Sequence, residues 1–263
     1  MHDAPEDDFK RGTGMSMTTN PIQETPLLSI RTLRIIIVTV VLFVLLLIAI
    51  NVIGRWLGGT IALAGHTTST DTFDITIGPD RLALTANTIR LPQARIHGTT
   101  DRIDLYLAWP EMAGYSPETS HRFNDLSRPG QLIFIQLGQS TMSRDMSGRL
   151  EPIYKDLFEG EEKPLEGGLT LHHLRRDSGY AGEVMITGKR DGQPDYAVRC
   201  ILPEDQHSAT NADCQRDIFA GRDMTVLYRF SSTLLPEWRA VDDAVRAYIE
   251  ARLIRAESPA QDR

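Results

Sequence analysis

The sequence predicts a mainly β fold of the α+β kind. One N-terminal transmembrane helix precedes an antiparallel β-rich domain, which a C-terminal amphipathic helix closes. Three observations support this. Apolar residues fill one uncharged run, Ile35 to Gly54. Beyond it they alternate with polar residues, as half-buried strands require. Near the end of the chain they recur at three- and four-residue steps, as on one helix face.

The uncharged run has the length of a membrane span. About twenty helical residues rise by roughly 30 Å, which matches the hydrocarbon core of a bilayer. We therefore predict a single-pass helix over residues 33–53 that contacts membrane lipid. The basic residues before the run are Lys10, Arg11, Arg31 and Arg34, and only Arg55 follows it before Arg81. This bias predicts a cytoplasmic N-terminus and an exported C-terminal domain.

A cleaved signal peptide is the alternative, because Ala62-Leu63-Ala64 has the small-residue pattern that signal peptidase reads. Hydrophobic regions of signal peptides run to about 7–15 residues, and here the run is longer and ends well before the pattern. The anchor is therefore favoured, while cleavage after Ala64 stays open. Met15 and Met17 leave open where translation starts.

Composition predicts the other boundaries. Residues 1–32 are polar and are expected to be a disordered cytoplasmic tail. Residues 54–70, with Gly58, Gly59 and a Thr/Ser run, are expected to be a spacer. One exported domain then spans residues 71–256, followed by a short disordered tail over residues 257–263.

About eight strands are predicted in the exported domain. Turn residues such as Gly78-Pro79-Asp80 and Asp177-Ser178-Gly179 separate neighbouring runs of alternating apolar residues. The predicted strands are 73–77, 82–91, 103–109, 131–137, 168–174, 183–187, 196–202 and 224–230. With no helix expected between most of them, we predict antiparallel pairing in a sandwich or half-barrel.

Two segments have helical periodicity instead. Residues 142–158 contain Gly148 and Pro152 and are expected to form two short helical pieces. Residues 236–256 are expected to form one amphipathic helix that covers an end or a face of the sheet, or that offers its apolar face to a partner. Its apolar face comprises Trp238, Val241, Val245, Tyr248, Ile249 and Leu253. Asp242 and Asp243 lie on its polar face and are expected to be solvated.

Only two cysteines occur, Cys200 and Cys214, both beyond the predicted anchor at the ends of a polar loop. In an oxidising compartment they are expected to form one disulfide, which closes a loop of about fifteen residues and contributes roughly 3 kcal/mol. Two unpaired buried thiols are the alternative. A metal site is disfavoured, because two sulfurs without a nearby pair of histidines fall short of four ligands. No Asn-x-Ser/Thr sequon occurs, which favours a bacterial protein facing the periplasm.

No catalytic residue, metal ligand or cofactor is assigned. The local signatures Gly-x-Ser-x-Gly, Ser-x-x-Lys and His-Glu-x-x-His of common hydrolases are absent from the sequence. His172 and His173 are neighbours on a predicted strand and face opposite sides, so one packed and one solvated histidine is expected. Glu159 to Glu162 is expected to be a solvated charged loop.

The charge balance disfavours nucleic acid as a partner. The chain has 28 Lys and Arg against 35 Asp and Glu, and no basic cluster occurs outside the membrane flank.

Two loops are the predicted sites of ligand or partner contact. Trp109 and Tyr115 bracket a loop after a strand and could form an aromatic recognition edge. The tip of a predicted hairpin carries two cations and an aromatic ring, from Arg175, Arg176 and Tyr180, and could bind an anionic envelope component. Core packing and ordinary turn chemistry are the alternatives for both loops.

These observations predict a single-pass protein of the bacterial inner membrane with a periplasmic domain. The first functional hypothesis is a non-enzymatic module that binds other envelope proteins as a scaffold, assembly factor or regulatory subunit. The second is a sensor or binding domain for an envelope ligand. The third is an envelope hydrolase with a dispersed site, which would need His172 or His173 to meet a carboxylate and a serine in one cleft.

Overall fold

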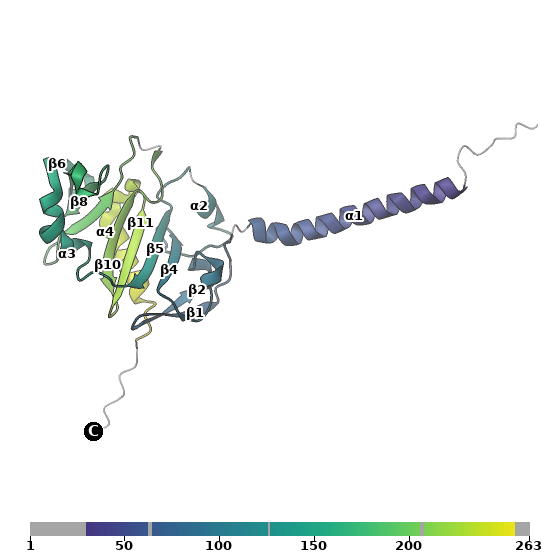
Figure 1. The fold of residues 1–263 in the computed structure, drawn as a ribbon, viewed down its shortest axis with the longest axis horizontal. Helices are drawn as coiled ribbons and strands as arrows, with labels where there is room; N and C mark the ends of the chain where they lie inside the picture. Colours follow the sequence, from purple (N-terminus) through teal and green to yellow (C-terminus); the bar gives the residue numbers. More distant parts are fainter. Residues whose placement is uncertain (1–29, 63–64, 126, 206–207, 256–263) are drawn as a thin grey trace, which may run out of the picture. The chain divides into compact units, whose positions relative to one another are not determined.

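The computed structural model describes residues 30–62, 65–125, 127–205 and 208–255 (Figure 1). The chain divides into two compact units, Met1–Gly58 and Gly59–Arg263. The tail predicted over residues 257–263, nearly all of the tail predicted over residues 1–32 and the cleavage position at Ala64 lie outside the described residues.

The helix α1, Ile30–Ala62, contains the apolar run. Its segment Ile30–Ile50 is long and apolar enough to cross a membrane, and the side chains of this segment are exposed. A helix of this kind near an N-terminus is either a membrane anchor or a signal sequence. It extends beyond the predicted end at Ile53 and includes Gly58 and Gly59. Isolated glycines cost a helix only about 1 kcal/mol each, so they need not end it.

The second unit is built on an antiparallel sheet of eight strands in the order β4-β5-β11-β10-β9-β8-β7-β6. The bounds are β4 Arg102–Ala108, β5 Leu132–Gln139, β6 Phe158–Leu165, β7 Leu169–Leu174, β8 Val184–Gly188, β9 Tyr196–Cys200, β10 Cys214–Ala220 and β11 Met224–Phe230. A small sheet has the order β2-β1-β3, with β1 Thr72–Ile77, β2 Asp80–Thr85 and β3 Gly98–Thr99. The predicted fold class, a mainly β domain between an apolar N-terminal helix and a C-terminal helix, is confirmed.

Strands β6 and β10 were not predicted. The charged residues 159–162 lie in β6, an edge strand whose register shifts between Glu159 and Lys163. Because nearly all side chains of β6 are exposed, its sequence does not show the alternation of apolar and polar residues that predicts a strand. In β10, Arg216 and Asp217 are both buried, so charge and burial do not alternate. Conversely, the strand predicted over residues 82–91 is shorter in the structure. Strand β2 ends at Thr85, and a 3₁₀ turn follows over Ala86–Thr88.

Two short α-helices occur between strands of the large sheet along the chain. The helix α2 is Ser120–Asn124, and α3 is Met146–Arg149. A π-helical turn, Leu150–Tyr154, and a 3₁₀ turn, Lys155–Leu157, continue α3, so helical structure does occur within the predicted 142–158 segment.

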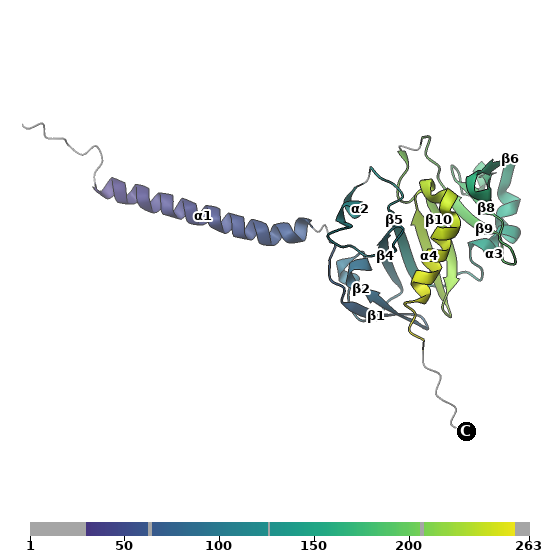
Figure 2. The ribbon, with the colours of Figure 1, turned by 180° about the vertical axis from the view of Figure 1, so that it is seen from behind.

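The C-terminal helix α4, Trp238–Glu250, follows a 3₁₀ segment, Ser232–Glu237, and ends earlier than predicted. The chain leaves the helix because it bonds to β2: the Ala83 amide donates to the Arg252 carbonyl, and the Ile254 amide donates to the Arg81 carbonyl. Figure 2 shows α4 across one face of the large sheet.

The main core lies between that face of the sheet, α4 and the small sheet. Core-facing side chains alternate along the strands, as in Ile103, Leu105 and Leu107 of β4, and meet Trp238 and Val241 of α4. A second apolar cluster lies under α3 and its π-helical continuation, where Met146, Leu150 and Tyr154 pack on Met185 and Ala197.

A buried carboxylate joins the two sheets. Asp80, the first residue of β2, accepts hydrogen bonds from the backbone amides of Arg222 and Asp223, in the β10–β11 turn. At Gly221 φ is +65°, and a Cβ there would lie 2.6 Å from a carboxylate oxygen of Asp80. The close approach of the two turns therefore requires glycine.

Cys200 and Cys214 form a disulfide, as predicted, at the one end where β9 and β10 pair. Replacing both cysteines with serine should lower the free energy of unfolding by about 3 kcal/mol, because the open loop regains entropy in the unfolded state. Chemical unfolding of the oxidised full chain, followed by tryptophan fluorescence, measures the loss. The same chain after reduction should show a similar loss, and an unchanged midpoint in both would contradict the assignment.

Candidate functional site

On one face of the large sheet, no described helix lies over β4, β5, β11 and β10 (Figure 1). We call it the open face. It carries the side chains that point away from α4: Asp104 of β4, Phe134 and Gln136 of β5, Gln215 and Asp217 of β10, and Thr225, Leu227 and Arg229 of β11. Because most of these side chains are half-buried, the face is neither core nor an ordinary solvated surface.

Two adjoining hollows follow the open face. The Arg229 hollow, about 390 Å³, is lined by residues that include Arg90, Asp104, Phe134 and Arg229. The Asp217 hollow, about 340 Å³, is lined by residues that include Arg102, Met142, Arg149 and Asp217. Gln136 and Leu227 line both, so the two hollows adjoin, and we call them together the trough.

An aromatic cluster stands at the β4 side of the open face. Tyr106 of β4 is packed against His66 and Phe123, and His66 stacks on Tyr115 with ring centroids 4.6 Å apart. The Tyr106 hydroxyl and His66 Nδ1 are hydrogen-bonded at 2.7 Å. Burial lowers the pKa of the His66 imidazole below its ordinary value, and the charge of Arg95 lowers it further. This cluster is structural packing that borders the trough.

An ion pair stands at the opposite side. Arg149 of α3 donates to the Asp217 carboxylate in a short contact, and both side chains are nearly buried. Burial raises the pKa of the Asp217 carboxyl, although the charge and hydrogen bond of Arg149 oppose that rise. The pair holds the helical segment against β10 and fixes that wall of the trough.

The Arg229 hollow has an excess of positive charge. The guanidinium of Arg90 lies 5.5 Å from the centroid of the Phe134 ring, and neither Arg90 nor Arg229 has a carboxylate partner among the described residues. Asp104, by contrast, accepts a hydrogen bond from Gln136 and lies 3.9 Å from Arg102. Two free guanidinium groups beside an aromatic ring favour a carboxylate ligand.

The first predicted contact loop is largely packed. Tyr115 is buried under His66, and Trp109 is half-buried against the main core. Arg122 of α2 donates to the Trp109 carbonyl and pairs with Glu111, which fixes the loop. The role of Trp109 and Tyr115 as partner contacts stays a prediction.

The second predicted loop lies near the opposite edge of the large sheet from the first. Arg175 and Arg176 are exposed, and Tyr180 lies under the guanidinium of Arg199, 4.6 Å from its ring centroid. The loop joins β7 to β8, whereas the Trp109 loop follows β4, so six strand spacings of ~4.8 Å separate β4 from β7 along the sheet. The two loops do not form one site, and contacts by Arg175, Arg176 and Tyr180 stay a prediction.

His172 is packed and His173 is exposed, as predicted. His172 Nε2 is hydrogen-bonded to the Thr187 hydroxyl at 2.9 Å, its Nδ1 lies 3.5 Å from Glu162, and the ring stacks on Phe158. The order hydroxyl, imidazole and carboxylate resembles a nucleophilic site. However, His172 does not line any of the five hollows found among the described residues, and its ring is packed against Phe158.

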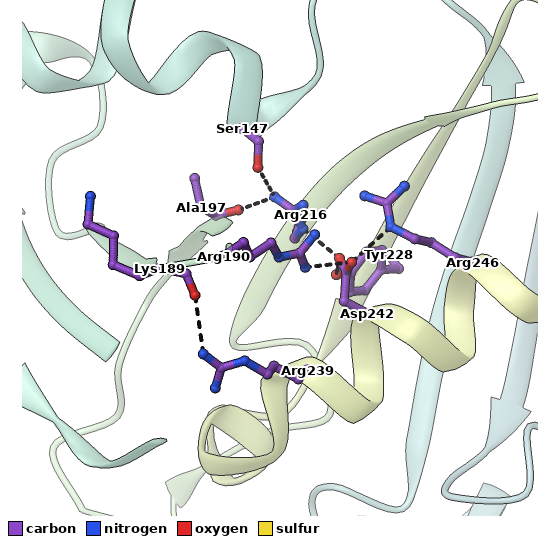
Figure 3. A network of polar contacts seen from close by, with 9 residues as sticks. All are labelled: Ser147, Lys189, Arg190, Ala197, Arg216, Tyr228, Arg239, Asp242 and Arg246. Carbon is purple, nitrogen blue, oxygen red and sulfur yellow. Dashed lines mark hydrogen bonds and ion pairs between the residues drawn. The ribbon is translucent and has the colours of Figure 1, made fainter. Parts of the chain in front are cut away.

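Asp242 corrects the sequence analysis. It was expected to be solvated on the polar face of the C-terminal helix, but its side chain is fully buried and accepts hydrogen bonds from four side chains (Figure 3). The donors are Arg216 Nε at 2.8 Å, Tyr228 Oη at 2.6 Å, Arg190 Nη2 at 2.7 Å and Arg246 Nε at 2.9 Å. We call Arg190, Arg216, Arg246 and Asp242 the arginine cluster.

The arginine cluster is held in an ionised state. Burial alone would raise the pKa of the Asp242 carboxyl, but the charge of Arg216 and the hydrogen bonds from Tyr228 and Arg216 outweigh burial and depress that pKa strongly. The sequence analysis missed the cluster because Arg216 occupies a core-facing position of an unpredicted strand. The available signal was an arginine between Cys214 and Ile218, both apolar and facing the same way.

Comparison with known proteins gives distant structural likenesses. No family model matches the chain, and no curated protein matches it significantly. An immunity protein of the Stenotrophomonas maltophilia type IV secretion system has 14% identity and a TM-score of 0.46, covering 73% of this chain and 96% of that one. An iron-regulated outer membrane lipoprotein of Neisseria meningitidis has 10% identity and a TM-score of 0.39, covering 70% and 95%. Likeness at these TM-scores supports no inference about function.

The packed state of His172 predicts a pH effect. Burial lowers the pKa of the His172 imidazole below its ordinary value of 6.5, although Glu162 partly opposes this. The unfolded chain therefore binds the proton more readily, so the contribution of His172 to stability is complete above pH 6.5 and declines as the pH falls toward the folded-state pKa. His172→Gln should reduce the fall in Tm of the full chain below pH 6.5.

His173→Gln, at the exposed neighbour, is the matched control and should retain the pH dependence of the unsubstituted chain. If His172→Gln and His173→Gln give the same Tm profile as the unsubstituted chain, His172 is not the buried neutral group described here.

Proposed function

We propose that the chain is a single-pass protein of the bacterial inner membrane whose periplasmic domain binds an acidic segment of another envelope protein. The observation that carries this proposal is the Arg229 hollow on the open face. It combines the guanidinium groups of Arg90 and Arg229, which have no carboxylate partner among the described residues, with the apolar surfaces of Phe134 and Leu227.

The anchor supports the cellular placement. The helix α1 contains a membrane-length apolar segment, and the basic residues before that segment favour a cytoplasmic N-terminus. The disulfide between Cys200 and Cys214 is the kind of bond that persists in an oxidising compartment such as the periplasm.

The open face supports a binding role over a catalytic one. Two of its carboxylates are engaged: Asp104 by Gln136, and Asp217 by Arg149. Engaged carboxylates are poorly placed to act as a general acid and base pair. A partner segment that places a carboxylate near Arg229 and an apolar side chain on Leu227 would satisfy the free donors and cover apolar surface.

Site-specific photo-crosslinking in intact cells tests the proposal. A photoreactive residue at Ala212, which is exposed and lines the Arg229 hollow, should capture a protein through a segment containing Asp or Glu. Arg229→Glu should lower that adduct about fivefold or more, since a lost ion pair at an interface rim weakens binding by roughly 1 kcal/mol and repulsion adds to the loss.

Arg81→Glu is the matched control, because Arg81 is an exposed arginine of the small sheet that does not line the Arg229 hollow. The proposal requires that this variant keep the adduct. Equal yields from Arg229→Glu and Arg81→Glu, or adducts that map to segments without acidic residues, would overturn it.

The topology is tested separately. The mature protein should stay with membranes during an alkaline carbonate wash, and protease added to the periplasmic side should digest the β-rich domain while sparing the N-terminal tail. Release of a shorter, soluble chain beginning after Ala64 would show instead that the helix is a cleaved signal sequence.

A further inference from the structure

A third hollow adjoins the arginine cluster, on the opposite side of the domain's sheet from the Arg229 hollow. This Arg246 hollow has a volume of about 340 Å³ and is lined by Asp145, Ser147, Arg190, Gln193, Pro194, Arg216 and Arg246. These residues come from four parts of the chain: α3 with the residue before it, the β8–β9 loop, β10 and α4. The volume is at the lower end of the range for small-molecule sites.

The charges around the Arg246 hollow do not balance. Three guanidinium groups, those of Arg190, Arg216 and Arg246, lie within 2.9 Å of the Asp242 carboxylate. The other carboxylate at the hollow, Asp145, accepts a hydrogen bond from the Gly148 amide at the start of α3. One positive charge remains in excess even when both carboxylates are counted, and an unpaired charge is costly at a partly buried site.

Arg216, which lines the hollow, also has one buried donor without a partner among the described residues. Arg216 is fully buried, its Nε bonds to Asp242, and its Nη1 donates to the Ser147 hydroxyl and the Ala197 carbonyl (Figure 3). Its Nη2 has no hydrogen-bond partner among the described residues. A buried guanidinium nitrogen without an acceptor costs free energy that a bound anion would recover.

The rings beneath the cluster fix the orientation of the guanidinium groups. The Tyr196 ring centroid lies 4.6 Å from the Arg216 guanidinium carbon and 5.4 Å from that of Arg190, and the Trp238 ring lies 5.3 Å from Arg190. A preorganised guanidinium loses little entropy when it binds an oxyanion. The side chain of Arg246 is 34% exposed, which leaves it able to turn toward a ligand.

We propose that the Arg246 hollow binds a small molecule through a phosphate or carboxylate group, with Arg190, Arg216 and Arg246 as the recognising residues. Planar guanidinium groups bind both oxyanions through paired hydrogen bonds. The Gln193 side chain at the rim supplies a further polar contact for the neutral part of the ligand.

Calorimetric titration of the full chain in non-ionic detergent, with inorganic phosphate in one arm and acetate in the other, tests the site at constant ionic strength. Binding of at least one anion at one site per chain is expected, and Arg246→Gln should weaken it about tenfold through loss of a charge-assisted hydrogen bond. Arg81→Gln removes the same charge from the small sheet and should leave the affinity unchanged.

Arginine footprinting keeps the test valid if Arg246→Gln does not fold. Phosphate or acetate should protect Arg246 of the unsubstituted chain from phenylglyoxal, read by peptide mass spectrometry, while Arg81 reacts at the same rate with and without the anion. Absence of binding in both arms, or equal protection of Arg246 and Arg81, would overturn the proposal.

Discussion

Arg216 places a full positive charge among the core-facing side chains of an otherwise apolar sheet face. Its neighbours on that side of β10 are Cys214 and Ile218, and it is fully buried. An isolated buried charge of this kind would not be tolerated, so the position depends on the carboxylate that Asp242 brings from α4. The rest of the fold depends on this pair, because it determines where α4 lies on the sheet. Tyr228 of β11 donates to the same carboxylate and joins a third element to it.

The pair also compensates for a break in the sheet. Strands β9 and β10 pair only at the end where Cys200 and Cys214 are joined. Beyond that end, the Ala197 carbonyl of β9 accepts a hydrogen bond from Arg216 Nη1 in place of a backbone amide of β10. Ser147 of α3 bonds to the same nitrogen, so α3 is fixed where the strands separate. With α4 held on one face and α3 at the separation, no described helix lies over the open face of β4, β5, β11 and β10.

Elements with regular periodicity could be predicted from the sequence. Elements whose burial depends on a contact with a residue distant in sequence could not. The strands around Leu105, Ile135 and Val226 and the apolar face of α4 follow from regular alternation, so they could be predicted. Strand β10 could not, because Arg216 and Asp217 are buried by partners distant in sequence, Asp242 and Arg149. The solvated placement expected for Asp242 was wrong for the same reason.

The residues of the candidate site could be predicted from the sequence less well than the strands. Trp109 and Tyr115 were selected because aromatic residues in a loop favour recognition, yet Tyr115 is buried in the aromatic cluster. The Arg229 hollow depends on three strands, which the sheet order brings together, and on Arg90 and Ala212 from loops. Nothing in the sequence alone predicts that β11 lies between β5 and β10.

A double-mutant cycle between Arg216→Met and Asp242→Asn tests the dependence on the buried pair most directly. Chemical unfolding of the full chain, followed by tryptophan fluorescence, gives the four free energies. Asp242→Asn should cost about 3–5 kcal/mol, because it leaves the buried charge of Arg216 without a carboxylate partner. Arg216→Met should cost less, because Asp242 keeps its hydrogen bonds from Arg190, Arg246 and Tyr228. The double change should cost at least ~2 kcal/mol less than the sum. Additive costs, within ~0.5 kcal/mol, would show that the two residues act independently and would contradict the account.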